Sequence, residues 1–148
     1  MQRLHVHIGV QDLDANIRFY TSLFGAEPTV AKEDYAKWML DDPRVNFAIS
    51  TRSGKTGLDH VGIQAETHTE LSDIEGRLNA AGIAGEAQVG TACCYARSDK
   101  YWTLDPQGIA WESFLTLGTV PTFNEAPEEQ SASGCCVPSI GNEEGCCR

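Results

Sequence analysis

The first half of the chain opens with alternating apolar and polar residues, as in a half-buried strand. Residues 3–10 read RLHVHIGV, and this two-residue period is typical of a β-strand. A helix is predicted next, with Asp12 or Asp14 as its N-cap and Gly25 as its stop. Its apolar face holds Ile17, Tyr20 and Phe24. Three further strands are predicted at residues 28–32, 35–40 and 45–51.

The second half repeats this order. Residues 58–65 (LDHVGIQA) form another strand pattern, and residues 67–70 (THTE) form a capping box that begins a helix ending at Gly82. The apolar positions at helical spacing are Leu71, Ile74, Leu78 and Ala81. The strands predicted after this helix are 87–90, 95–104 and 109–115. Aligning the two opening strands places His5 over His60.

The repeat predicts an α+β fold of two βαβββ modules, at about residues 1–53 and 57–118, pairing into an open mixed-sheet barrel. The two modules together make one domain, residues 1–118. Residues 119–148 are rich in Pro, Gly, Ser and Glu and have one aromatic residue, Phe123. Because such a composition cannot bury a core, we expect a disordered tail.

Charge and hydropathy narrow the class of partner. The 148 residues carry 11 Lys and Arg against 21 Asp and Glu, a formal net charge of −10. This argues against nucleic acid or an anionic membrane as partner, since both attract basic surfaces. The sequence shows no signal-peptide core and no apolar run long enough to span a membrane. We therefore expect a cytoplasmic protein with a small-molecule partner.

All six cysteines stand in adjacent pairs: Cys93-Cys94, Cys135-Cys136 and Cys146-Cys147. Neighbouring Cα atoms are about 3.8 Å apart, closer than the roughly 4.4–6.8 Å usual for a disulfide. In a cytoplasmic chain the pairs are best interpreted as reduced dithiols, which bind soft, thiophilic elements. The alternatives are chance and ordinary packing.

A candidate metal site combines the two modules. His5 and His60 begin equivalent strands, and Glu112 lies in the last strand. Two imidazoles and one carboxylate make the facial triad of non-haem Fe(II) enzymes that activate O₂. His7 lies two residues along the same strand and shares the face of His5, so periodicity does not separate the two. The alternative is that these histidines are structural.

Three motifs resemble the vicinal oxygen chelate superfamily, which includes glyoxalases and extradiol dioxygenases. HVHIGVQDLDANIRFYTSLFG resembles the opening of its first module, LDHVGIQ that of its second, and LDPQGIAWESF the closing strand. The resemblance implies that His5, His60 and Glu112 bind the metal, and that His7 lines the pocket. Ala48 and Ile49 stand near the first-half equivalent of Glu112, so no fourth ligand is offered there. A three-ligand centre leaves positions open and fits an oxygenase.

The segment GTACCYARSDKYWTLDP, which contains Cys93 and Cys94, indicates the class of substrate. A trivalent monoorganoarsenical has two exchangeable valences, each able to take one thiolate. The body, the vicinal pair and the cysteine-rich tail resemble the C–As lyases of organoarsenical resistance, some of which are labelled cadmium-induced proteins. The resemblance implies Fe(II)- and O₂-dependent cleavage of trivalent organoarsenicals, such as methylarsenite and aromatic arsenicals, to arsenite. It places arsenic on Cys93 and Cys94. For the assembly we expect a monomer or a homodimer.

Two other functions use only part of these features. An ordinary extradiol dioxygenase or glyoxalase-like enzyme uses the metal triad and leaves Cys93-Cys94 without a role. A soft-metal or arsenical-binding protein without turnover uses the cysteines and leaves the triad vestigial. For residues 90–100 we expect a polar loop that closes over the site, the alternative being a rigid hairpin.

Overall fold

The computed structural model describes residues 1–121 of the chain. They form two compact units, one of residues 3–62 and the other of residues 1–2 together with those from 63 onward. The predicted tail with Cys135-Cys136 and Cys146-Cys147 lies almost wholly outside the described residues. Within them, no helix is long and apolar enough to cross a membrane.

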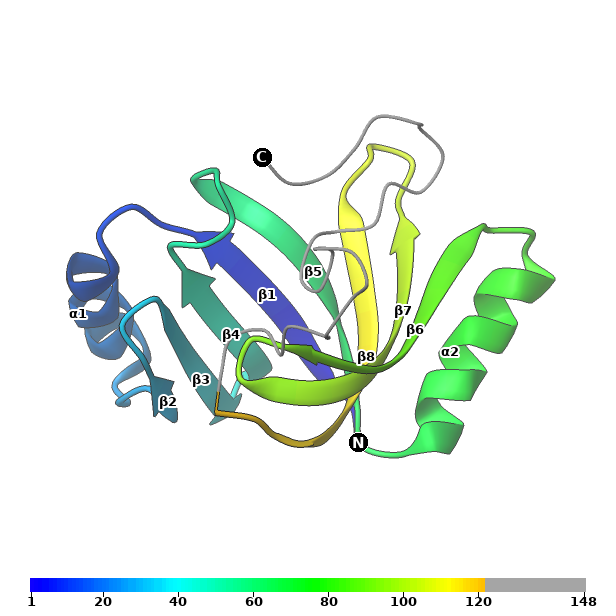
Figure 1. Cartoon of the computed structure of the whole chain (residues 1–148), viewed down its shortest axis with the longest axis horizontal. Helices are drawn as coiled ribbons and strands as arrows, with labels where there is room; N and C mark the ends of the chain where they lie inside the picture. The colour runs from blue at the N-terminus through cyan, green and yellow to red at the C-terminus, as the bar shows by residue number, and fades with distance from the viewer. Residues whose placement is uncertain (122–148) are drawn as a thin grey trace. The chain divides into compact units, whose positions relative to one another are not determined.

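The predicted order β-α-β-β-β occurs twice, and the fold is α+β (Figure 1). The first series is β1 (Arg3–Gly9), α1 (Leu13–Phe24), β2 (Val30–Ala31), β3 (Tyr35–Asp41) and β4 (Arg44–Ser50). The second is β5 (Gly57–Ala65), α2 (His68–Ala80), β6 (Gly85–Cys93), β7 (Ala96–Leu104) and β8 (Ala110–Thr119). The prediction of the repeat is therefore confirmed, with strand ends that differ by a few residues.

In the first unit, β1 lies beside β4 in a parallel pair, and β3 runs antiparallel to both β4 and β2. Alternation along β1 gives the sheet two different faces. Val6 and Ile8 pack into an apolar core with α1, β3 and β4, in which Trp38 is completely buried. His5 and His7 are buried on the opposite face. The apolar core therefore holds one face of β1 in place while the other carries imidazoles.

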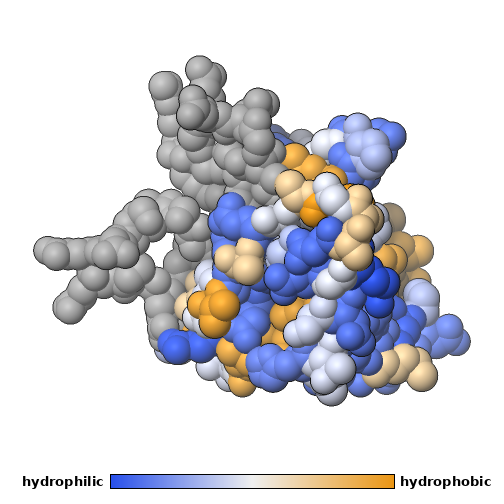
Figure 2. Space-filling view, turned by 90° about the vertical axis from the view of Figure 1, so that its right-hand side faces the viewer, coloured by the Kyte–Doolittle hydropathy of each residue, from blue (hydrophilic) through white to orange (hydrophobic). Residues whose placement is uncertain are grey.

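In the second unit, β6, β7 and β8 form an antiparallel sheet. Leu71 of α2 packs with Tyr101 and Leu115 of this sheet, and the Tyr101 hydroxyl donates to Asn79 Oδ1 on α2 at 3.0 Å. Figure 2 faces the side of Figure 1 on which α2 is drawn, and hydrophilic residues predominate there. The helix thus presents one apolar face to the sheet and a polar face to solvent.

The helix boundaries were predicted by their capping residues. Of the two candidates for α1, Asp12 is the N-cap, and its side chain accepts a hydrogen bond from Ala15 N at 2.9 Å. Thr67 caps α2 by accepting from Glu70 N at 3.2 Å. The return bond of the capping box is displaced by one residue, because the Glu70 carboxylate accepts from Glu66 N. Gly25 ends α1 in the left-handed conformation, with φ 63°.

Residues 90–100 form the hairpin given as the alternative, and the expectation of a polar loop is wrong, while its closure over the site is untested. Strands β6 and β7 continue through this segment and form a hairpin, with a register shift between Gln88 and Thr91. Ser98 and Lys100 are only 4% and 7% exposed, although their polarity suggested a position in solvent. Lys100 can be buried because the Glu112 carboxylate forms an ion pair with it. The polarity of the surrounding sequence does not reveal this partner.

The cap of α1 gives a direct test of these contacts. We expect Asp12→Ala to lower the free energy of unfolding by about 1 kcal/mol, because Ala15 N loses its acceptor. Asp12→Asn should retain most of the stability, since asparagine caps helices about as well as aspartate. Urea unfolding followed by circular dichroism measures both variants. Equal losses in the two variants would mean that the charge, rather than the cap, stabilises the helix.

Candidate metal centre and cysteine pair

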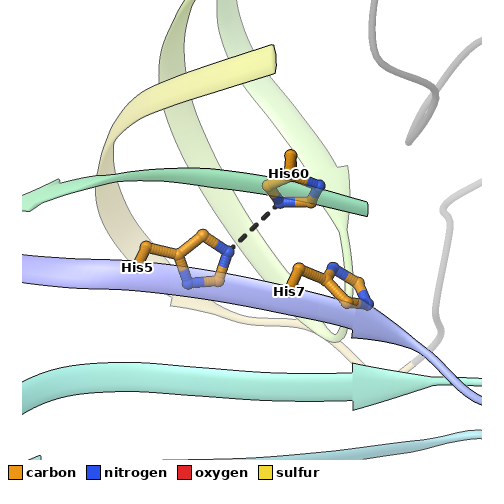
Figure 3. Close-up of side chains that lie close together, drawn as sticks. All are labelled: His5, His7 and His60. Atoms are coloured by element: carbon orange, nitrogen blue, oxygen red, sulfur yellow. Dashed lines mark hydrogen bonds between the residues drawn. The ribbon is translucent and has the colours of Figure 1, made fainter. Parts of the chain in front are cut away.

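Three buried histidines cluster in the first unit (Figure 3). His5 and His7 come from β1, and His60 comes from β5. The Nε2 atoms of His5 and His60 are 3.2 Å apart, and candidate ligand nitrogens of all three rings lie within 4.8 Å of one another. The structure therefore brings together the two predicted histidine ligands, and it adds His7 to them.

Hydrogen bonds to the opposite ring nitrogens set the orientation of two of these rings. His5 Nδ1 lies 3.0 Å from the backbone oxygen of Asn46, and His60 Nδ1 lies 3.0 Å from Asp59 Oδ1. A carbonyl and a carboxylate both accept hydrogen bonds, so these contacts assign the proton of each ring to Nδ1. Each Nε2 then presents a lone pair. Metal-binding histidines characteristically have this arrangement.

Two lone pairs that face one another at 3.2 Å repel each other unless a cation lies between them. A shared proton or a metal ion provides that cation. Burial by itself raises the pKa of Asp59, but the hydrogen bond from His60 and the charges of His60, His7 and Lys55 outweigh burial and lower it. Asp59 is therefore a carboxylate at neutral pH, which supports positive charge at this cluster.

Strand β4, which pairs with β1 in parallel, offers no ionisable ligand beside His5 and His7. Asn46, Ala48 and Ser50 of β4 pair with His5, His7 and Gly9 in register. Ser50 Oγ lies 2.9 Å from His7 Nε2, and Ile49 belongs to the apolar core. The interpretation that Ala48 and Ile49 supply no fourth ligand agrees with this register.

Glu112, the predicted carboxylate ligand, lies on β8 in the second unit. Its Oε1 is 2.6 Å from Lys100 Nζ, and both side chains are buried. A carboxylate has two oxygens and about four lone-pair sites, so this ion pair is compatible with a second role. Glu112 and the three imidazoles belong to different units. That Glu112 binds the same metal ion as His5 and His60 therefore stays a prediction.

Lys100 interacts with two predicted site residues. Burial by itself lowers the pKa of Lys100, but the charges of Glu112 and Cys94 and the hydrogen bond to Glu112 raise it above its ordinary value. Lys100 is therefore a buried cation at neutral pH. It contacts the candidate metal ligand and interacts electrostatically with the candidate arsenic ligand.

Cys93 and Cys94 lie at the tip of the β6–β7 hairpin. Cys93 ends β6, Ala96 pairs with it across the hairpin, and Cys94 and Tyr95 make the turn with φ angles of 55° and 62°. Such angles cost non-glycine residues roughly 1–2 kcal/mol each. The turn brings the two sulfur atoms to 2.9 Å. Adjacent side chains of a regular strand point to opposite faces, so it is this turn that allows the two sulfurs to face one another.

Three residues of these two sites were not predicted from the sequence. Asp59 immediately precedes His60, and a carboxylate adjacent to a candidate ligand is a signal that was available. Lys100 gave no such signal, because a lysine within a polar stretch is typical of an exposed loop. Ser50 is one neutral residue among many, and only the register of β1 and β4 places it against His7.

Comparison with known proteins finds relatives that match nearly the whole chain. A trivalent organoarsenical cleaving enzyme of Bacillus sp. strain MD1 is 40% identical over 151 residues, covering 99% of this chain and 91% of the relative. Cadmium-induced protein CadI of Mycobacterium tuberculosis is 34% identical over 142 residues, with coverages of 92% and 93%.

Solved structures show the same fold at lower identity. An extradiol ring-cleaving dioxygenase from B. fuscum aligns with a TM-score of 0.59 and 17% identity, over 80% of this chain and 33% of that one. The family model described as Glyoxalase/Bleomycin resistance protein/Dioxygenase superfamily matches residues 2–113. Since this match spans most of the chain, the protein belongs to the Glyoxalase/Bleomycin resistance protein/Dioxygenase superfamily.

Proposed function

We propose that the protein cleaves the carbon–arsenic bond of trivalent organoarsenicals, using Fe(II) and O₂, and releases arsenite. One observation carries the proposal: two adjacent cysteine sulfurs lie 2.9 Å apart at a backbone turn. The chain has this feature together with 40% identity to a protein named as a trivalent organoarsenical cleaving enzyme. Methylarsenite and trivalent aromatic arsenicals are the substrates we expect, and resistance to them is the biological role.

The metal ligands in this proposal are His5, His60 and Glu112. The paired Nε2 atoms and their oriented rings suit a metal ion, and imidazole and carboxylate ligands are those of non-haem Fe(II) oxygenases. When bound, Fe(II) supplies the activation of O₂ that oxidative cleavage requires. Asn46 and Asp59 hold the two imidazoles in the orientation that ligation needs.

Capture of the arsenical is the task of Cys93 and Cys94. Two arsenic–sulfur bonds form while two arsenic–oxygen bonds break, and each hydroxide leaves as water with one cysteine proton. Arsenic stays trivalent, and its third bond remains the bond to carbon. Capture by both sulfurs requires both cysteines to be reduced, and a reducing cytoplasm is the compartment that fits the proposal.

Lys100 is a positioning residue in this scheme. Its ammonium lies 2.6 Å from Glu112 Oε1 and interacts with the charge of Cys94. A buried cation stabilises both the carboxylate and an anionic sulfur. The cation thereby favours a Glu112 carboxylate for the metal and eases loss of the Cys94 proton during attack on arsenic, because thiolates, rather than thiols, are the nucleophiles.

Arsenic speciation tests the proposal against its rivals. The reduced full-length protein is incubated in air with Fe(II) and methylarsenite, and the arsenic species are separated and quantified. We expect arsenite as the product. Methylarsenite that stays bound and intact would instead indicate a binding protein, and no interaction would indicate an ordinary extradiol dioxygenase or glyoxalase-like enzyme.

Variants in the same assay separate the two sites. His60→Ala should lose Fe(II) binding and turnover, because one of the paired Nε2 ligands is removed. Cys94→Ser should lose turnover with Fe(II) still bound, since a hydroxyl is a hard, poor ligand for arsenic. His68→Ala is the matched control, because His68 is exposed on α2. Unchanged turnover in Cys94→Ser would contradict the assignment of arsenic to the pair.

The role of Lys100 predicts a change in stability. We expect Lys100→Met to lower the free energy of unfolding by about 3–5 kcal/mol, because the buried Glu112 carboxylate loses its cation. The double variant Lys100→Met/Glu112→Gln should recover most of this loss, since the uncompensated charge is gone. Urea unfolding at neutral pH measures both.

The choice of neutral pH follows from the direction of the pKa shift. The ion pair with Glu112 raises the pKa of Lys100 above its ordinary value of 10.5. The contribution of this ion pair to the free energy of unfolding is therefore complete at neutral pH, and it is lost only as pH rises through the raised pKa. A double variant as unstable as Lys100→Met would show that the ion pair is not the cause.

A further inference from the structure

The first unit contains a second set of metal-ligand side chains, which does not include Glu112. His5 and His7 stand two residues apart on β1, so both side chains point to the same face of the strand. Each is only 5% exposed, although imidazole is polar and its burial is costly without compensation. Two imidazoles on one strand face, with a third on another strand, make a donor set known from catalytic zinc enzymes.

The spacing of His5 and His60 fits a tetrahedral zinc ion. Nitrogen ligands bind Zn²⁺ at about 2.0–2.1 Å, which places two of them about 3.3 Å apart at the tetrahedral angle. The two Nε2 atoms are 3.2 Å apart. Their Nδ1 atoms are engaged by the Asn46 carbonyl and the Asp59 carboxylate, so each Nε2 presents a lone pair to such an ion.

His7 is close enough to complete the set. Its ring centroid lies 4.8 Å from that of His60 and 6.4 Å from that of His5, and the candidate ligand nitrogens of the three lie within 4.8 Å. A side-chain adjustment of about 1–2 Å brings the third nitrogen to a zinc–ligand distance. The Ser50 hydroxyl near His7 Nε2 either donates or accepts, so it holds the ring in place in either tautomer.

The surroundings favour a dication at this point. The three imidazoles are neutral when they bind a metal, and the Asp59 carboxylate 3.0 Å from His60 Nδ1 supplies negative charge. Imidazole ligands suit Zn²⁺, and zinc binds a given nitrogen site more tightly than Fe²⁺ does. A site made only of imidazoles therefore prefers zinc to the iron of the proposed reaction.

We propose that His5, His7 and His60 form a three-imidazole site for Zn²⁺ within the first unit, independent of Glu112. It shares His5 and His60 with the iron centre of the proposed function, so the two metals exclude one another. Zinc thereby holds the protein in a form that carries no iron. The site itself does not depend on whether the protein cleaves arsenicals, because all of its ligands and orienting contacts belong to residues 3–62.

Metal titration of the full-length, untagged and reduced protein tests this site. Co²⁺ replaces Zn²⁺ as a coloured probe, and visible absorption reports its geometry, while sulfur-to-cobalt charge-transfer bands reveal any cysteine ligand. Zinc affinity then follows from the displacement of Co²⁺. The variants are His7→Ala, His7→Gln and Glu112→Gln, with His68→Ala as a matched histidine control. Circular dichroism and thermal unfolding confirm that each variant is folded.

We expect His7→Ala and His7→Gln to weaken zinc binding by more than about 100-fold, beyond the 10–100-fold typical of losing a residue that only orients a ligand. Glu112→Gln and His68→Ala should keep the wild-type affinity and a tetrahedral cobalt spectrum. A wild-type affinity and spectrum in the folded His7 variants would overturn the proposal. So would a loss in Glu112→Gln equal to that in His7→Ala. Neither outcome bears on arsenical cleavage, which the speciation assay decides separately.

Discussion

Two imidazole nitrogens facing one another at 3.2 Å constrain the rest of the site. Two facing lone pairs would repel one another at this distance, so the two nitrogens share either a proton or a metal ion. The fold maintains the contact from both sides, through the Asn46 carbonyl on β4 and the Asp59 carboxylate on β5. Behind β1, an apolar core built around Trp38 prevents the strand from moving away.

The second unit contains a cluster of charged and polar groups. A carboxylate, a cysteine sulfur and an ammonium group interact on one hairpin and its neighbouring strand, and Lys100 is the member that compensates the other two. Beside them, the positive φ angles at Cys94 and Tyr95 draw neighbouring sulfurs together. Strained backbone of this kind persists where the surrounding structure enforces it, and it is found often at functional sites.

Much of the fold and part of the site could be predicted from the sequence. The alternation in residues 3–10 and 58–65 and the caps at Asp12 and Thr67 depend on local physics, so they were correctly predicted. The pairing of His5 with His60 followed from the internal repeat. Lys100 escaped prediction because its burial depends on Glu112, a partner twelve residues away on another strand. The distance from His7 to the other two rings escaped prediction because periodicity gives a face and no distance.

The central claim is that cleavage of the arsenic–carbon bond requires both the captured arsenical and oxidation by O₂. An anaerobic single-turnover experiment tests it most directly: the reduced protein is loaded with Fe(II) and one equivalent of methylarsenite, and arsenite is quantified before and after O₂ is admitted. The account predicts no arsenite before O₂ and up to one equivalent afterwards. Release of arsenite without O₂, or intact methylarsenite after prolonged exposure to O₂, would contradict it.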